Sequence, residues 1–306
     1  MPAWIRNPDY FVYRDHRRIV AVCPFPTTRG QVSITDAGGL LYCVLPEEEL
    51  VQLFVDIRYF ANRLAEVTHV RRVGMASDGR VIHLIPMHGL GEDWQPILHD
   101  EKVFYPTWPG YFTSKSGPRM KQEDLNATQA KIIAVSDLQS PFDNTFHGDA
   151  SDTNLFARIV RGEEEQWRIW EDEGHVAFLT PFGNTVGYTV VVPRRHLHSD
   201  VFQIDEPDFE ALMRAVHTVM VVLKKAFTTE TVGVFFEGFE IDYTHAKLIP
   251  AHGEKATVVD REIDTIERHD TYPGYLTTQL GPPANKGELL ALRDALCQCN
   301  TPPWVD

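Results

Sequence analysis

The residues best suited to chemistry in this sequence are a tyrosine, a histidine and a lysine, spaced two positions apart in the stretch YTHAKLIP at 243–250. Successive side chains of a strand point to opposite faces, so Tyr243, His245 and Lys247 would share one face. The residues between them are small or apolar and would suit a helix. A neutral imidazole is a good nucleophile near neutral pH, and a neighbouring ammonium can balance charge on phosphoryl oxygens. The row indicates attack on a phosphate by His245, anion binding without chemistry, or a histidine with a structural role.

A second stretch, GRVIHLIP at 79–86, ends on the same three residues. Val81 stands in the place of His245, Gly79 in the place of Tyr243, and His83 in the place of Lys247. Because valine offers no nucleophile, we expect this stretch to be catalytically silent.

The two stretches belong to an internal duplication. In the front part of each half, identical residues are separated by 157 positions: Asp15 and Asp172, Pro24 and Pro181, Gly30 and Gly187. In the back part the separation is 164 positions: Gly74 and Gly238, Asp78 and Asp242, Pro86 and Pro250, His88 and His252, Pro109 and Pro273, Gly117 and Gly281. A net insertion of seven residues in the second half explains the change.

Each half has the same order of predicted elements. Strands flank a Pro-Phe turn, and a glycine leads into a β-branched strand. A helix follows at 46–67 or 205–227, with apolar residues at steps of three and four, and a short strand ends at Leu-Ile-Pro. This order predicts an α+β fold with an antiparallel sheet and a packed helix in each unit. We assign residues 1–125 to the first domain, 126–152 to a linker, and 153–306 to the second domain.

The second half resembles the histidine triad (HIT) superfamily of nucleotide hydrolases and transferases. The resemblance rests on WEDEGHVAFLTPFGNTVGYTVVVPRRHLHS, a helix, and then EGFEIDYTHAKLIPAHG. It extends more faintly over the first half. It implies two HIT-like units packed as a pseudo-dimer within one chain, the first unit degenerate. It also implies that His245, the middle position of the family's His-x-His-x-His run, forms a covalent nucleotidyl-histidine.

The chain departs from the family pattern at several positions. Tyr243 and Lys247 replace the outer two histidines, and Tyr188 replaces the histidine of the family's Gly-His-Thr. We expect Lys247 to meet the α-phosphate and Tyr243 to hold the neighbouring backbone or ring. Glu237 lies near the place of an asparagine that touches the nucleotide in relatives. Asn184 is a candidate for a ribose or phosphate contact, or else an ordinary turn residue.

Three further motifs can be interpreted from the sequence. YPGYLTTQLGP at 272–282 is expected to fold over the second unit's pocket as a clamp, or to seal a sheet edge. The run PRRHLHSD at 193–200 suggests surface charge and structural hydrogen bonds, with metal binding as the minor alternative. His88 and His252 occur in both halves, which favours a shared structural role.

Composition limits the remaining choices. A net charge of −14 argues against a nucleic-acid partner, and no apolar run approaches the roughly 20 residues that span a bilayer. The N-terminus has no signal-peptide or targeting pattern, so we expect a cytoplasmic protein. The four cysteines are too few and scattered for a disulfide framework, and we expect reduced thiols.

The sequence therefore predicts an enzyme that acts at the α-phosphate of a small-molecule nucleotide, as a hydrolase or nucleotidyl transferase. The family suggests dinucleoside polyphosphates or nucleoside phosphoramidates. The motif requires no metal cofactor, although Mg²⁺ is compatible with a polyphosphate substrate. The alternative is a non-catalytic nucleotide-binding sensor or interaction module. Association of whole chains into larger oligomers stays open.

Overall fold

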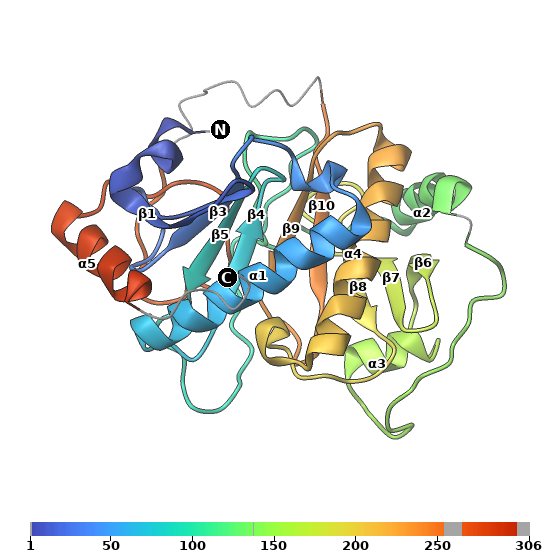
Figure 1. Cartoon of the computed structure of the whole chain (residues 1–306). Coiled ribbons are helices and arrows are strands. Elements are labelled where there is room, and N and C mark those ends of the chain that lie inside the picture. The colour runs from blue at the N-terminus through green and yellow to red at the C-terminus, as the bar shows by residue number, and fades with distance from the viewer. Residues whose placement is uncertain (1, 137, 254–264, 299–306) are drawn as a thin grey trace.

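A single ten-stranded sheet forms the centre of the computed structural model, which describes residues 2–136, 138–253 and 265–298 (Figure 1). The first unit contributes β1 Phe11–Arg14, β2 Arg18–Val22, β3 Val32–Asp36, β4 Val73–Ser77 and β5 Val81–Pro86. The second contributes β6 Trp167–Glu171, β7 His175–Leu179, β8 Thr189–Pro193, β9 Val232–Phe236 and β10 Ala246–Pro250. All neighbouring strands are antiparallel.

The strand order shows the duplication directly. It runs β1-β2-β3-β5-β4 in the first unit and continues β9-β10-β8-β7-β6 in the second, which is the same order reversed. The two units meet where β4 pairs with β9, and Ala76 lies opposite Phe235 at this junction. The predicted fold is confirmed: two equivalent α+β units form one pseudo-twofold body within the chain.

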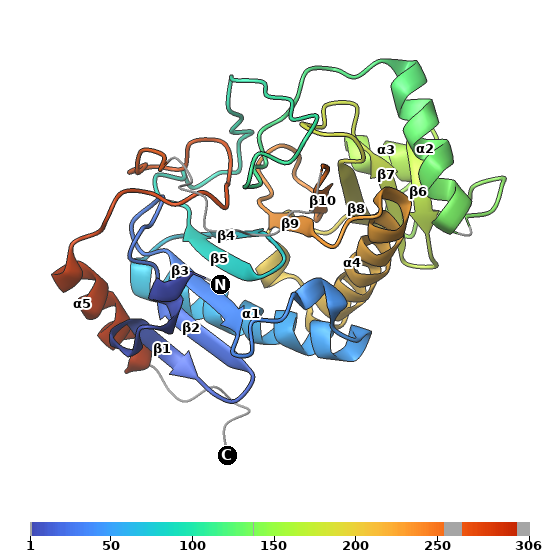
Figure 2. The same ribbon diagram turned by 90° about the horizontal axis from the view of Figure 1, so that it is seen from above.

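Two long helices cover one face of the sheet. They are α1 Glu47–Thr68 and α4 Glu206–Phe227, and they pack side by side (Figure 2). The apolar residues predicted at helical spacing are buried in both, including Phe54 in α1 and Phe209 in α4. Each helix ends on a residue in the left-handed conformation, His69 in one and Thr228 in the other. The main apolar core lies between these helices and the sheet.

Shorter helices occupy the outer edges. α2 Gln122–Ser136 packs against β6 and α4, and α5 Lys286–Cys297 packs against β1 and α1, so the two occupy equivalent places at opposite ends (Figure 1). The segment expected to be a linker thus begins inside α2. The remaining elements are α3 Leu155–Val160 and the 3-10 turns η1 Ala3–Arg6, η2 Pro8–Tyr10, η3 Tyr42–Val44 and η4 Val201–Gln203.

Irregular segments cover the other face of the sheet, and each crosses to the opposite unit. We call residues 101–120 and 265–284 the crossing segments. In the first, the Gly117 amide donates to the Phe182 carbonyl of the second unit at 2.6 Å. In the second, the Gly281 amide donates to the Phe25 carbonyl of the first unit at 2.8 Å. Thr113 and Thr277 form an isolated bridge where the two segments meet.

The strand register corrects part of the predicted alignment. Pro86 lies opposite Val73 and Pro250 lies opposite Val232, so the equivalents in β4 and β9 are 159 positions apart, five fewer than the prolines. Gly74 therefore corresponds to Gly233, and its predicted match with Gly238 was wrong. The five extra residues lie in the loop between β9 and β10, which also carries Tyr243 and His245.

These two strand glycines permit the crossing. A Cβ on Gly74 would lie 2.7 Å from Cδ1 of Leu276, and one on Gly233 would lie 2.8 Å from Cγ of Phe112. Leu276 and Phe112 are themselves equivalent residues of the two crossing segments. Each segment therefore inserts an apolar side chain against the central strand of the other unit.

Candidate functional site

The structure brings Tyr243, His245 and Lys247 to the face of the sheet that carries no long helix. Ala246 and Leu248 point into the core beneath α4, as the strand alternation predicts. Tyr243 instead joins a small apolar cluster around α3 on the opposite face. The row therefore lies beneath irregular segments and α3.

His245 is held in one orientation and one protonation state. Its Nδ1 lies 2.7 Å from the carbonyl oxygen of Tyr243, which can only accept, so we assign the ring proton to Nδ1. Burial, followed by the charge of Lys247, lowers the pKa of His245 to about 4. The ring is 2% exposed and packs edge-on against Phe156 of α3. The imidazole is thus neutral at pH 7, with a lone pair on Nε2.

Lys247 is paired with two carboxylates. Its Nζ lies 2.8 Å from Oε2 of Glu237 and 3.2 Å from Oε2 of Glu240. Burial opposes a charge on this lysine, but the neighbouring carboxylates outweigh it and raise its pKa well above the usual value. The charge of Lys247 in turn lowers the pKa of Glu240. The ammonium is therefore charged, and its charge is already balanced by these partners.

Glu237 joins the two units at this point. Its carboxylate accepts hydrogen bonds from Lys247, from Ser114 Oγ at 3.0 Å, and from the hydroxyl of Tyr272. Ser114 belongs to the first crossing segment and Tyr272 to the second. Burying a carboxylate is costly unless it is paired and hydrogen-bonded, and these three donors meet that need.

Tyr243 and Asn184 both hold parts of the structure together. The Tyr243 hydroxyl donates to the Pro193 carbonyl at 2.7 Å, and its ring stacks on His196 at 4.7 Å between centroids. Asn184 Nδ2 donates to the carbonyls of Thr113 and Lys115 at 2.7 and 2.9 Å. The side-chain nitrogen of Asn184 thus fixes the first crossing segment.

Comparison with known proteins gives no match to any family model. An uncharacterised HIT-like protein of Methanocaldococcus jannaschii is 30% identical over 112 residues, which are 34% of this chain and 84% of that protein. The chain belongs to the HIT-like family. An uncharacterised HIT-like protein of Saccharolobus solfataricus is 24% identical over 127 residues, covering 40% of this chain and 91% of the relative.

Solved structures similar to this HIT-like chain fall into two groups. A mutant uridylyltransferase aligns over 94% of this chain and 91% of its own, with 9% identity and a TM-score of 0.49. A HIT family member from Bacillus subtilis aligns over 38% of this chain and 84% of its own, with 21% identity and a TM-score of 0.31.

The first HIT-like unit has no nucleophile at the equivalent place. Val81 is buried against Ile5, Ile19 and Ala21. Next to it, His83 Nδ1 lies 2.9 Å from Ser33 Oγ, and burial lowers the pKa of His83 to about 4. His83 is thus a buried structural histidine.

Several contributors to the site were not found from the sequence, among them Ser114 and Phe156. Glu240 follows Glu237 by three residues, and this spacing close to Lys247 was the available signal. Arg72 Nη1 and Trp94 Nε1 both donate to the Gly238 carbonyl, at 3.1 and 2.8 Å. Both belong to the first HIT-like unit, and sequence spacing gives no signal for a contact between units.

The structure tests the predictions made for YPGYLTTQLGP and for His88 and His252. Residues 276–281 of the expected clamp lie over the first HIT-like unit, and within YPGYLTTQLGP it is Tyr272 that reaches Glu237. The prediction of a clamp over the segment's own pocket was therefore wrong for most of its length. His88 Nε2 and His252 Nε2 contact the carbonyls of Arg29 and Val186, which are equivalent positions. The predicted shared structural role is confirmed.

The described residues contain neither a cluster of metal-ligating side chains nor a membrane-spanning helix. Within 2–136, 138–253 and 265–298, no group of three or more His, Cys, Asp or Glu residues is placed to hold a metal ion. In the basic run, His196 contacts Asp152 through Nδ1 and the Asp242 carbonyl through Nε2, both at 2.7 Å. No helix in the described part of the chain is long and apolar enough to cross a membrane.

Proposed function

We propose that this HIT-like chain hydrolyses or transfers a nucleotide, with His245 as the nucleophile at the α-phosphate. The hydrogen bond from His245 Nδ1 to the Tyr243 carbonyl carries the proposal, because it leaves the Nε2 lone pair available. A low pKa keeps this lone pair unprotonated at pH 7. A purely structural role for a histidine does not require this tautomer.

The reaction would proceed in two displacements. Nε2 of His245 forms a bond to the α-phosphorus while the bond from phosphorus to the leaving group breaks, and the leaving group departs with the electron pair of that bond. Water or another acceptor then attacks the same phosphorus, the bond from phosphorus to Nε2 breaks to restore the free imidazole, and the acceptor's proton passes to solvent. Two easier steps replace one difficult step, and each inverts the configuration at the phosphorus atom.

Lys247 affects which substrate suits the site. An α-phosphate near its ammonium would also lie near Glu237 and Glu240, whose negative charges oppose it. A polyphosphate that carries its own Mg²⁺ brings a compensating positive charge. The dinucleoside polyphosphate class therefore fits these residues better than the phosphoramidate class.

The same carboxylates support the second candidate, a nucleotide-binding or interaction module without chemistry. His245 is 2% exposed, and the charge of Lys247 is already balanced. A binding module needs neither an accessible Nε2 nor an unpaired cation at this point.

Trapping of a labelled intermediate separates the two candidates. Wild type, His245→Ala and the control His16→Ala would be incubated with α-³²P-labelled dinucleoside polyphosphate or phosphoramidate, with Mg²⁺ or EDTA, and denatured in alkali. We expect acid-sensitive label on wild type and on the His16 variant, and none on His245→Ala. Equilibrium dialysis with the same nucleotides completes the test. Binding without label or turnover would establish the module and refute the enzyme, and absence of both would refute the two candidates together.

A further inference from the structure

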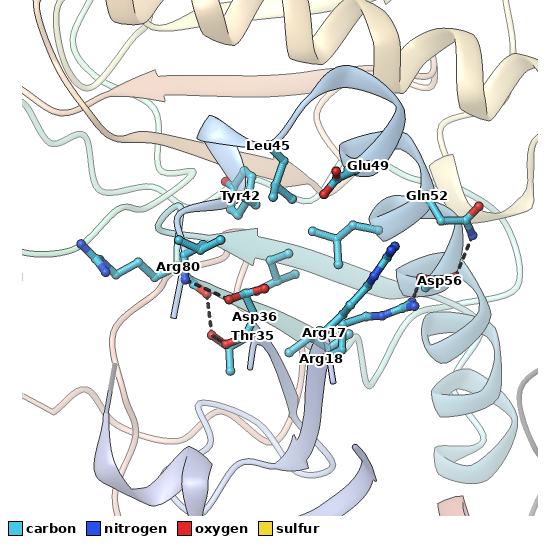
Figure 3. A pocket seen from close by; sticks show the side chains of 14 residues that line it. Arg17, Arg18, Thr35, Asp36, Tyr42, Leu45, Glu49, Gln52, Asp56 and Arg80 are labelled. Atoms are coloured by element: carbon cyan, nitrogen blue, oxygen red, sulfur yellow. Dashed lines mark hydrogen bonds and ion pairs between the residues drawn. The ribbon is translucent and has the colours of Figure 1, made fainter. Parts of the chain in front are cut away.

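A cavity of about 150 Å³ lies on the helix face of the first unit (Figure 3). The row at His245 lies on the opposite face of the sheet. The cavity is bounded by α1, by β2, β3 and β5, and by the segment from Asp36 to Leu45. The site discussed above does not use it.

The interior of the cavity is apolar. Ile34 and Ile82 form its floor on the sheet, Leu53 of α1 closes one side, and the ring of Tyr42 closes another. Tyr42 is fixed, because its hydroxyl contacts the Val232 carbonyl of the second unit at 3.3 Å. Such walls suit the body of a small organic molecule.

A buried ion pair stands at one end of the cavity. The Arg18 guanidinium contacts the Asp56 carboxylate, and these side chains are 11% and 2% exposed. Gln52 Nε2 donates to Oδ1 of Asp56 at 3.0 Å and orients it. Desolvating two charges in this way adds little or nothing to stability in general.

The duplication shows that the fold does not need this pair. The positions equivalent to Arg18 and Asp56 in the second unit are His175 and Ala215. Ala215 is buried in the core. His175 Nδ1 lies 3.4 Å from Oδ1 of Asp172, which matches the contact of Arg18 Nη2 with Oδ2 of Asp15 at 3.6 Å, so the contact with Asp56 is the one without an equivalent. The first unit therefore has a buried ion pair beside a cavity, and the second unit has no equivalent of this pair.

The charges around the cavity indicate what it can hold. Three arginines and three carboxylates line it: Arg17, Arg18, Arg80, Asp36, Glu49 and Asp56. Because these charges balance, neither an anion nor a cation is favoured as a whole. Arg17, directly before β2, and Glu49, in the first turn of α1, both line the cavity (Figure 3), and neither side chain pairs with any described residue.

We propose that this cavity is a second ligand-binding site, for a small uncharged molecule with an apolar or aromatic body and an amide group. The amide carbonyl accepts a hydrogen bond from the Arg17 guanidinium, and the amide N–H donates to the Glu49 carboxylate. The ring or alkyl part lies over Ile34 and Ile82. This site is independent of the nucleotide chemistry proposed for His245, so either proposal can fail without the other.

Three probes of equal size and different charge test the proposal on the full chain. Benzamide, benzoate and benzylamine would be titrated into ¹⁵N-labelled protein, and amide shifts in α1 and β3 followed by TROSY spectra. A fragment of this size is expected to bind with a Kd in the millimolar range. Benzamide should bind about tenfold more tightly than either charged probe, as expected when one well-placed hydrogen-bonded group is lost.

Two variants locate the binding, and one serves as a control. Arg17 is exposed, and Arg17→Gln should raise the benzamide Kd about tenfold because one hydrogen bond is lost. Leu53→Trp should fill the cavity and abolish the shifts. Arg268→Gln, an exposed arginine outside the cavity, should leave the Kd unchanged. Equal binding of the charged probes would overturn the assigned ligand class. No benzamide shifts in α1 and β3, or shifts unaffected by Arg17→Gln, would overturn the site.

Discussion

The protonation of His245 is the most direct test of the candidate active site. In the folded chain its pKa is about 4, against an ordinary value of 6.5, because the ring is buried beside Lys247. We expect an imidazole that stays neutral to well below pH 5, with its proton on Nδ1. Both properties follow from burial and from the bond to the Tyr243 carbonyl.

The lowered pKa of His245 also makes the folded chain less stable at low pH. Between pH 6.5 and about 4 the unfolded chain binds a proton at this histidine and the folded chain does not, so stability falls as the pH falls. A difference of that size corresponds to about 3 kcal/mol of unfolding free energy, present in full above pH 6.5 and lost by about pH 4. His245→Asn, which can still donate to the Tyr243 carbonyl, should remove this part of the pH dependence.

Long-range ¹H–¹⁵N spectra of the histidine rings report both the tautomer and the titration midpoint. Urea denaturation of wild type and His245→Asn at pH 7 and pH 4 reports the free energy. His83, whose pKa is also about 4, serves as an internal reference for a buried histidine without a proposed role. A midpoint near 6.5, or a proton on Nε2, would refute the assignment of His245 as a nucleophile poised by its environment.

Three other outcomes follow from the same structure. Glu237→Gln leaves the Lys247 ammonium with one carboxylate and should lower the free energy of unfolding by about 1–3 kcal/mol in urea denaturation; an unchanged value would show that the pair is not closed in solution. Gly281→Ala places a Cβ 2.0 Å from a carbonyl oxygen of the first unit and should cost about 1–3 kcal/mol, while Gly91→Ala, with open space around it, should stay within about 0.5 kcal/mol. Asn184→Ala loses two hydrogen bonds to the first crossing segment and should lower Tm with nucleotide labelling per folded molecule unchanged; the reverse pattern would indicate a nucleotide contact.

The duplication and the helices could be predicted because they are written in local patterns. Repeated Pro, Gly and His residues fixed the two units, and the apolar spacing from Leu50 to Leu64 fixed α1. The alternation around His245 also predicted correctly which face carries the row. The helix spacing and the strand alternation depend on residues close together in the sequence, and the duplication was found by comparing two such local patterns.

The rest depends on contacts between distant residues. Identical glycines suggested that Gly74 matches Gly238, but pairing against Pro86 and Pro250 sets the register and selects Gly233 instead. The charge around Lys247 likewise depends on Glu240 in the extended loop and on Tyr272 from the second crossing segment. A single sequence contains no signal for which unit a crossing segment covers.

The crossing segments also affect the order in which the chain can fold during synthesis. Gly281 donates to the Phe25 carbonyl, a contact between residues more than 250 positions apart. The loop-covered face of the first unit is therefore complete only after almost the whole polypeptide has been synthesised. Such nonlocal contacts slow folding. We expect a nascent first half to expose apolar surface around Gly74 until the second half emerges, and this makes it a substrate for chaperones at an intermediate chain length.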